Sequence, residues 1–270
     1  GLSISGYPKN LPSRKSRNQR PSVAILREQG VNGHIEMAAA FTKADFHAVD
    51  VHMSDISSYS EDLRGFDGLA VCGGFSYGDV LGAGQGWASS VTHIPHVREV
   101  FLNFFLRKNT FTLGVCNGCQ MLSLLKDIIP GAELWPSFHE NKSGQFEARL
   151  TMVEVAPSPS IFLGELSGLR APIVVSHGEG RVINSPENKN LVCVRYIDNF
   201  GNVTETYPSN PNGSESGIAG LTSSDGRATI MMPHPERAFL KKQLSWSPDS
   251  WLNEESPWME MFNAARRAVK

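Results

Sequence analysis

The sequence lacks any apolar run long enough to cross a membrane, and its N-terminus lacks the basic-then-apolar pattern of a signal peptide. It also lacks an excess of one charge, because the net charge is only −2 over 270 residues. That balance gives no electrostatic basis for binding nucleic acid or an anionic membrane. We therefore expect a cytoplasmic protein that binds neither.

Cysteine is scarce as well, with four residues in the chain: Cys72, Cys116, Cys119 and Cys193. A few scattered cysteines in a chain this long are typical of a reduced protein rather than one stabilised by disulfides. Cys72 and Cys193 lie in apolar runs, where buried free thiols are common. Cys116 and Cys119 form a C-x-x-C pair without a second C-x-x-C, so the sequence predicts no metal site.

The first twenty residues differ from the rest of the chain. They are rich in Lys, Arg, Asn, Ser and Pro and show almost no apolar periodicity, which predicts a linker or tail over 1–20. A length of 270 residues is ample for one large buried core. We expect a single domain over 21–270, with its first strand starting at Ser22.

Strand and helix patterns alternate through the first half of this domain. Strands are predicted at 23–26, 46–52, 67–72 and 111–115, and helices at 34–44, 97–106 and from the residue after Cys116 through Lys126. This alternation predicts an α/β fold with a mostly parallel central sheet flanked by helices.

The second half has a different pattern. Strand-like segments at 147–155, 172–176, 191–196 and 228–232 are separated by turn signals at 198–202, 210–214 and 223–226. They predict antiparallel additions on or beside the parallel sheet. A final helix is expected over 258–269.

Cys116 lies where a predicted strand meets a predicted helix, within G-V-C-N-G (114–118). This G-x-C-x-G pattern is the thiol version of the nucleophile elbow, in which glycines relieve crowding around a sharp turn. A helix N-terminus also favours a thiolate. The pattern favours a nucleophile at Cys116, with a redox pair or a core thiol as the alternatives. Cys119, one helical turn further on, is expected to be a packing residue.

A cysteine nucleophile needs a histidine, and the chain offers three His-x-Glu pairs. His34 and Glu36 lie in a predicted helix, where residues two apart point to nearly opposite sides. The pair His177 and Glu179 follows a strand but is flanked by glycines, which suits a binding loop. In M-M-P-H-P-E-R the prolines are expected to hold His234 and Glu236 extended and side by side, which favours this pair as base and orienting acid.

The glycines at 82, 84 and 86 do not form a dinucleotide site, because the third falls one residue early for G-x-G-x-x-G and no strand immediately precedes them. A loop bordering the active site is the expectation. Phe75, Ser76, Tyr77 and Asp79 could contact a substrate or only fix that loop.

An elbow cysteine followed far downstream by P-H-P-E resembles the class I, or triad, glutamine amidotransferases. These enzymes hydrolyse glutamine through a γ-glutamyl thioester and pass the ammonia to a partner active site. Five segments in order are similar, more narrowly, to the glutaminase domain of the phosphoribosylformylglycinamidine synthase family of purine biosynthesis: 26–32, 72–84, 114–120, 176–181 and 231–237.

The resemblance implies a role for each matching residue. Cys116 would be the nucleophile, His234 the base and later acid, and Glu236 the orienting carboxylate. The resemblance gives Gly74 as one oxyanion donor, and the elbow geometry gives the N–H of Asn117 as the other. The remaining expected contacts to glutamine are Gly73, Phe75, Gln120 and His177.

The same resemblance implies a partner. Ammonia would pass to a synthetase domain, in the same polypeptide or in a complex, that uses ATP and Mg²⁺ to convert formylglycinamide ribonucleotide to its amidine. This chain itself is expected to hold no cofactor. Alternatives are a free-standing glutamyl hydrolase or cysteine peptidase of the same fold, or a non-catalytic interaction module. Gln145 stands where the family tends to have Arg, which puts local binding detail in doubt but leaves the triad intact.

Overall fold

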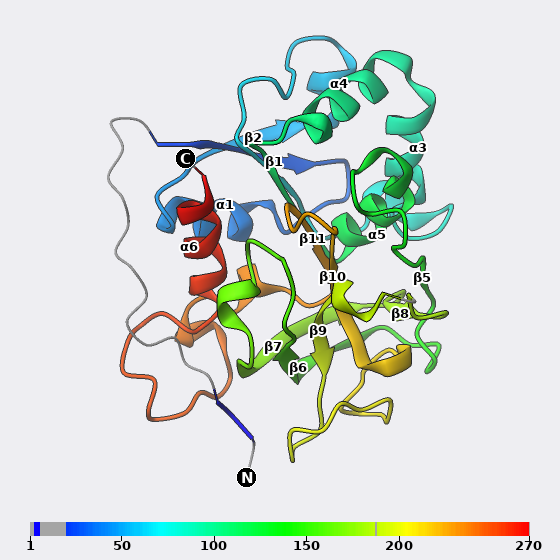
Figure 1. Cartoon of the computed structure of the whole chain (residues 1–270). Helices are drawn as coiled ribbons and strands as arrows, with labels where there is room; N and C mark the ends of the chain where they lie inside the picture. Colours follow the sequence, from blue (N-terminus) through cyan, green and yellow to red (C-terminus); the bar gives the residue numbers. More distant parts are fainter. Residues whose placement is uncertain (1–2, 6–19, 187, 270) are drawn as a thin grey trace.

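A nine-stranded mixed sheet organises the part of the chain that the structure describes, residues 3–5, 20–186 and 188–269 of this computed structural model (Figure 1). The strand order is β2-β1-β3-β4-β11-β10-β9-β6-β7. The bounds of these strands, in chain order, are β1 Ser22–Arg27, β2 His47–His52, β3 Gly68–Val71, β4 Phe111–Val115, β6 Glu147–Val155, β7 Arg170–His177, β9 Val192–Tyr196, β10 Ile218–Thr222 and β11 Ala228–Met231.

The strands β2, β1, β3, β4 and β11 are parallel to one another. The predicted α/β class with a mostly parallel sheet is therefore confirmed. The strand β11 corrects one detail: the sequence placed it among the antiparallel additions, but it pairs parallel with β4, with Met231 opposite Val115. The chain turns from β10 into β11, and these two strands are antiparallel. On its other side β11 runs in the same direction as β4, so it belongs to the parallel part of the sheet.

The strands β10, β9, β6 and β7 form the predicted antiparallel extension. The strand β10 was not predicted, because its sequence I-A-G-L-T contains a central glycine and shows no clear alternation of apolar and polar residues. A separate two-stranded sheet pairs β5 (Phe138–His139) with β8 (Arg181–Val182) in the described chain.

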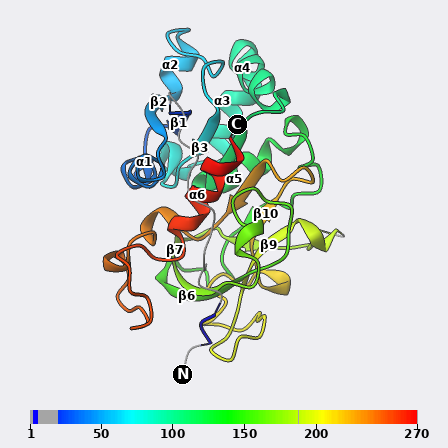
Figure 2. The same cartoon turned by 60° about the vertical axis from the view of Figure 1, so that its left-hand side comes forward.

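Helices cover both faces of the parallel strands (Figures 1 and 2). On one face α1 (His34–Lys43) packs against α6 (Met259–Ala268), with the rings of Phe41 and Phe262 5.1 Å apart. On the other face lie α3 (Gln85–His93), α4 (Pro95–Leu106) and α5 (Asn117–Leu124). The helix α3 and the short α2 (Met53–Ser57) were not predicted, because α3 begins inside the glycine-rich segment and α2 directly continues β2.

The predicted tail, residues 1–20, lies mostly outside the described residues. Of its described part, Ser5 forms two backbone hydrogen bonds with Arg170 at the start of β7, at 2.9 and 3.2 Å.

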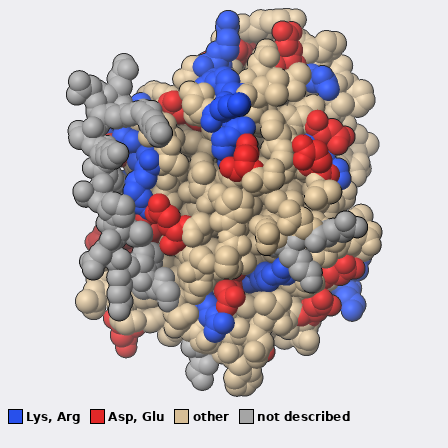
Figure 3. Space-filling model, in the orientation of Figure 1, with Lys and Arg blue, Asp and Glu red and all other residues tan. Residues whose placement is uncertain are grey.

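The described surface carries both charges. On the face shown in Figure 3, Lys and Arg are interspersed with Asp and Glu outside the grey atoms. No helix in residues 3–5, 20–186 and 188–269 combines the length and apolar character that crossing a bilayer requires.

Candidate functional site

Cys116 occupies a strained turn between β4 and α5. Its φ is 54° and its ψ is −110°, a combination that L-residues rarely adopt outside functional turns. The strand ends at Val115 and the helix begins at Asn117. This geometry matches the predicted elbow: the side chain is 6% exposed, and its thiol donates a 3.5 Å hydrogen bond to the carbonyl oxygen of Ser176 on β7.

The two elbow glycines are needed for close packing. A Cβ on Gly118 would lie 2.0 Å from the carbonyl oxygen of Val71 in β3, and one on Gly114 would lie 2.9 Å from the carbonyl oxygen of Gly118. Any side chain at either position would push α5 away from the sheet and displace Cys116 with it.

Cys119 has a different environment from Cys116. It is completely buried in α5, and burial, together with the nearby charge of Cys116, raises its pKa well above the ordinary range. The four cysteines are all free thiols. The position fits the predicted packing role better than a reactive one.

His234 follows β11 and is paired with Glu236. Its Nδ1 lies 2.6 Å from Glu236 Oε1, and the two side chains are 1% and 0% exposed. The prediction that the prolines keep this segment extended is only half right. His234 is extended, but Pro235 starts a 3₁₀ turn, η6 (Pro235–Arg237), because proline suits the first position of a helical turn. This turn brings the carboxylate back to the imidazole.

The charges around His234 favour its protonated form. Burial alone would lower its pKa, but the negative charges of Glu236 and Cys116, together with the hydrogen bond to Glu236, raise the pKa to about 10. The Nε2 atom, opposite the atom bonded to Glu236, has no hydrogen-bond partner among the described residues. His234 is thus set up to hold a proton beside the thiol.

Gly73 shows how closely the two groups approach. A Cβ on Gly73 would lie 2.8 Å from His234 Cε1 and 3.2 Å from Cys116 Cβ. The imidazole, the cysteine and the turn after β3 therefore converge on one point. The structure brings together these three regions, which are far apart in the sequence.

Two backbone N–H groups are free beside this point. Gly74 has φ 147°, and a Cβ there would meet the backbone of Val31 at 2.5 Å, so only glycine fits. Neither the N–H of Gly74 nor that of Asn117 donates a hydrogen bond to a described residue. Their availability is what an oxyanion site requires.

His177, the competing histidine, ends β7, and its surroundings favour the neutral imidazole. It is 2% exposed, and burial together with the positive charge of His234 lowers its pKa to about 3. Its Nε2 lies 3.0 Å from Asn212 Nδ2, which must be the donor. Glu179 does not contact this imidazole in any described bond; its Oε2 accepts the N–H of Ala83 instead.

The third pair is not part of the site. His34 and Glu36 both lie in α1, as predicted, and Glu36 faces Arg237 at 3.6 Å.

A pocket of about 310 Å³ opens beside Cys116. It is lined by residues from the end of β7, from the loops after β1, β3, β7 and β11, from the elbow and α5, and from the segment before β6: Asn32, Gly74, Phe75, Gly78, Asp79, Ala83, Cys116, Gln120, Phe146, Ser176, His177, Gly178, Glu179, His234 and Arg237. Most predicted site residues share this one pocket. A larger hollow of about 470 Å³ beside α2 and α4 contains none of them.

The polar wall of the pocket is a network that the sequence did not predict. The Asn117 amide donates to Asp79 Oδ1 at 2.9 Å and to Gln120 Oε1 at 3.3 Å. The amide of Gln120 donates in turn to the carbonyl oxygen of Glu179 at 2.6 Å. Burial, with the nearby charge of Glu179, raises the pKa of Asp79.

The other flagged residues lie around the pocket mouth. The ring of Phe75 is half exposed and 5.9 Å from that of Phe146. Gln145 is exposed, and its backbone carbonyl accepts a hydrogen bond from Asn141. No role was predicted for Arg237 or Asn212, because Arg237 is only the last residue of M-M-P-H-P-E-R and Asn212 lies in a segment with the pattern of a turn. No cluster of three or more potential metal ligands occurs in residues 3–5, 20–186 and 188–269.

Comparison with known proteins places the chain in a family. A family model for the CobB/CobQ-like glutamine amidotransferase domain matches residues 20–269, so the chain belongs to this family of glutamine amidotransferases. PurLQS from Thermotoga maritima shares the fold at 22% identity and a TM-score of 0.68, with 93% of this chain and 100% of that one covered. A putative GMP synthase protein from Thermoplasma acidophilum shares it at 14% identity and a TM-score of 0.55, with 94% and 96% covered.

Proposed function

We propose that this chain hydrolyses L-glutamine to glutamate and ammonia through a thioester on Cys116. The observation that carries the proposal is the strained elbow that holds Cys116 beside the buried His234–Glu236 pair. Family membership supports glutamine as the substrate.

In the first step the thiol proton resides on His234, in the thiolate–imidazolium pair that the raised pKa of His234 favours, and Sγ of Cys116 attacks the side-chain amide carbon of glutamine. The carbonyl oxygen becomes an oxyanion, for which the free N–H groups of Gly74 and Asn117 are the donors. Glu236 orients the imidazole and stabilises the imidazolium.

In the second step the imidazolium gives its proton to the amide nitrogen, the C–N bond breaks, and ammonia leaves. The acyl group remains on sulfur as a thioester. His234 then takes a proton from water, the hydroxide attacks the thioester carbon, and the C–S bond breaks. Cys116 recovers the proton, which leaves glutamate, and the enzyme returns to its starting state.

The pocket has groups for both charges of the amino-acid end. Asp79 and Glu179 contact only amide and backbone N–H donors among the described residues, so their charge is available to the α-ammonium group. Arg237 lines the same pocket and can reach the α-carboxylate. Gln120, His177 and Phe75 would complete the walls around the chain of the substrate.

The ammonia is proposed to serve a synthetase that makes formylglycinamidine ribonucleotide with ATP and Mg²⁺. The five resembling segments carry this narrower assignment. All five contribute to the pocket, through Asn32, Phe75, Cys116, His177 and His234. The fold shared with PurLQS supports the framework on which those segments are placed.

Replacing the two cysteines separately tests the function. Cys116→Ala should lower glutaminase activity, measured with the synthetase partner supplied, by at least about 10³-fold, because the nucleophile is lost. The matched control Cys119→Ala should keep most of the activity. Equal losses would favour a redox pair, whereas hydrolysis of γ-glutamyl peptides in preference to glutamine would favour a glutamyl hydrolase.

A further inference from the structure

Three neighbouring strands position the residues of the proposed site. In the sheet β3, β4 and β11 are adjacent and parallel, and their carboxyl ends lead to Gly73, Cys116 and His234. These strands come from distant parts of the chain. The relative positions of the three residues therefore depend on the register between the strands.

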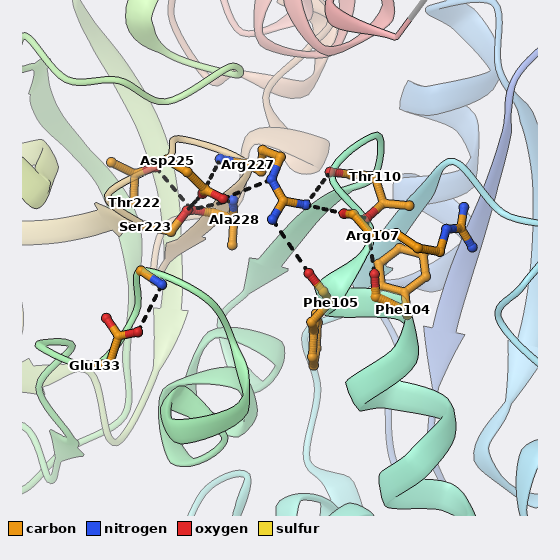
Figure 4. A network of polar contacts seen from close by, with 11 residues as sticks. Phe104, Phe105, Arg107, Thr110, Glu133, Thr222, Ser223, Asp225, Arg227 and Ala228 are labelled. Atoms are coloured by element: carbon orange, nitrogen blue, oxygen red, sulfur yellow. Dashed lines mark hydrogen bonds and ion pairs between the residues drawn. The ribbon is translucent and has the colours of Figure 1, made fainter.

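At the opposite end of these strands Arg227 joins β11 to the segment that enters β4 (Figure 4). Its Nη1 donates to the carbonyl oxygens of Arg107 at 2.5 Å and Thr110 at 3.3 Å, and its Nη2 to that of Phe105 at 3.5 Å. Its Nε donates to Asp225 at 2.8 Å, which fixes the orientation of the guanidinium.

Arg107 repeats the arrangement one strand further along. Its guanidinium donates to the carbonyl oxygens of Leu63 at 3.0 Å, Arg64 at 2.8 Å and Phe66 at 2.5 Å, all in the segment that enters β3. Arg107 therefore makes both connections: its backbone carbonyl accepts a hydrogen bond from Arg227, and its guanidinium binds the segment that enters β3. The two arginines form a continuous connection across the amino ends of all three strands.

The chemistry of these contacts favours a fixed register. A planar guanidinium offers several donors in a rigid fork, whereas a lysine ammonium is a compact point charge that cannot span spaced carbonyls. Charge-assisted hydrogen bonds are also stronger than neutral ones. The backbone ladder continues the connection, because the N–H of Thr112 donates to the carbonyl oxygen of Arg227 at 2.9 Å.

We propose that Arg227 and Arg107 are positioning residues, which hold the three strands in the register that sets Cys116 against His234. They lie at the amino ends of the strands, separated from the proposed site by the five residues of β4, or about 16 Å at about 3.3 Å per residue, and touch no substrate. The proposal rests on the proposed function only for its kinetic readout.

The test compares Arg227→Met, Arg227→Lys and Arg107→Lys with a control, Arg195→Met. Arg195 is partly buried and also donates to a carbonyl, that of Ser216, but it lies on β9, which carries none of the three residues. For each full-length variant, kcat and KM for glutamine are measured per folded molecule with the synthetase partner supplied. The rate of Cys116 alkylation by iodoacetamide is measured across pH.

We expect the Arg227 and Arg107 variants to lose about tenfold in kcat with KM changed by less than about twofold, because small displacements of reacting groups are costly. Their alkylation profile should shift along the pH axis, since the imidazole no longer faces the thiol as before. Arg195→Met should lower only stability. Kinetic constants and profiles equal to those of the control would overturn the proposal. Should the wild-type chain itself show no glutaminase activity, the proposed function fails and the alkylation profile alone decides on the two arginines.

Discussion

His177 ends one strand and His234 follows another, and each stands two positions before a glutamate, yet the fold gives them opposite surroundings. His234 bonds its glutamate at 2.6 Å, and neighbouring negative charge raises its pKa. His177 bonds Asn212 instead, and burial lowers its pKa to about 3. The same local pattern therefore yields an imidazole with a raised pKa in one loop and an imidazole with a lowered pKa in the other.

The difference comes from the residue after each histidine. Pro235 starts a tight turn that folds Glu236 back onto the imidazole. In the other loop Gly178 allows the chain to continue, so Glu179 reaches Ala83 across the pocket. The residue between histidine and glutamate decides which partner the carboxylate finds.

Removing each histidine in turn should produce the largest difference between the two loops. His234→Asn should lower kcat for glutamine by about 10⁴-fold, because the proton acceptor beside the thiol is lost. His177→Asn should change kcat by less than about tenfold and act mainly on KM. Steady-state kinetics of both variants check this, and a loss at His177 as deep as at His234 would show that the two loops share one task.

A methyl group placed against each imidazole should separate the two roles. Gly73→Ala puts a Cβ 2.8 Å from His234 Cε1 and should lower kcat by about 10²-fold with little change in stability. Gly180→Ala puts a Cβ 2.3 Å from His177 Cδ2 and should cost about 1–3 kcal/mol of unfolding free energy. Urea unfolding and kinetics of the pair give the answer, and the reverse distribution of effects would contradict the assignment.

The smallest effect is the pH dependence of stability. Because the pKa of His177 is lowered from 6.5 to about 3, its neutral form stabilises the fold above pH 6.5, and this contribution is lost as pH falls toward 3. His234 has the opposite sign: its contribution is present below pH 6.5 and lost as pH rises toward 10. Between pH 6 and 4, His177→Gln should flatten the stability curve by up to about 1.4 kcal/mol per pH unit. Parallel curves for variant and wild type would mean that His177 titrates normally in the folded chain.

The sequence predicts local geometry well and long-range partners poorly. The elbow at Cys116 was predictable because the glycines that it needs are adjacent in the chain. The partner of His177 was not, because Asn212 lies 35 residues downstream in a segment that looks like a simple turn. The parallel pairing of β11 was also hidden, since nothing in A-T-I-M-M distinguishes a parallel from an antiparallel neighbour.

The Asp79–Asn117–Gln120 network was missed for a related reason. Asp79 and Gln120 were each flagged, but only the packing of α5 against the loop after β3 brings their side chains to the same amide.

Labelling with a glutamine-mimicking electrophile shows whether the elbow and the His234–Glu236 pair activate Cys116. We expect one modified residue, Cys116, mapped by peptide mass spectrometry, with protection by glutamine and loss of labelling in His234→Asn. Modification at Cys119, or no modification with the synthetase partner present, would contradict it.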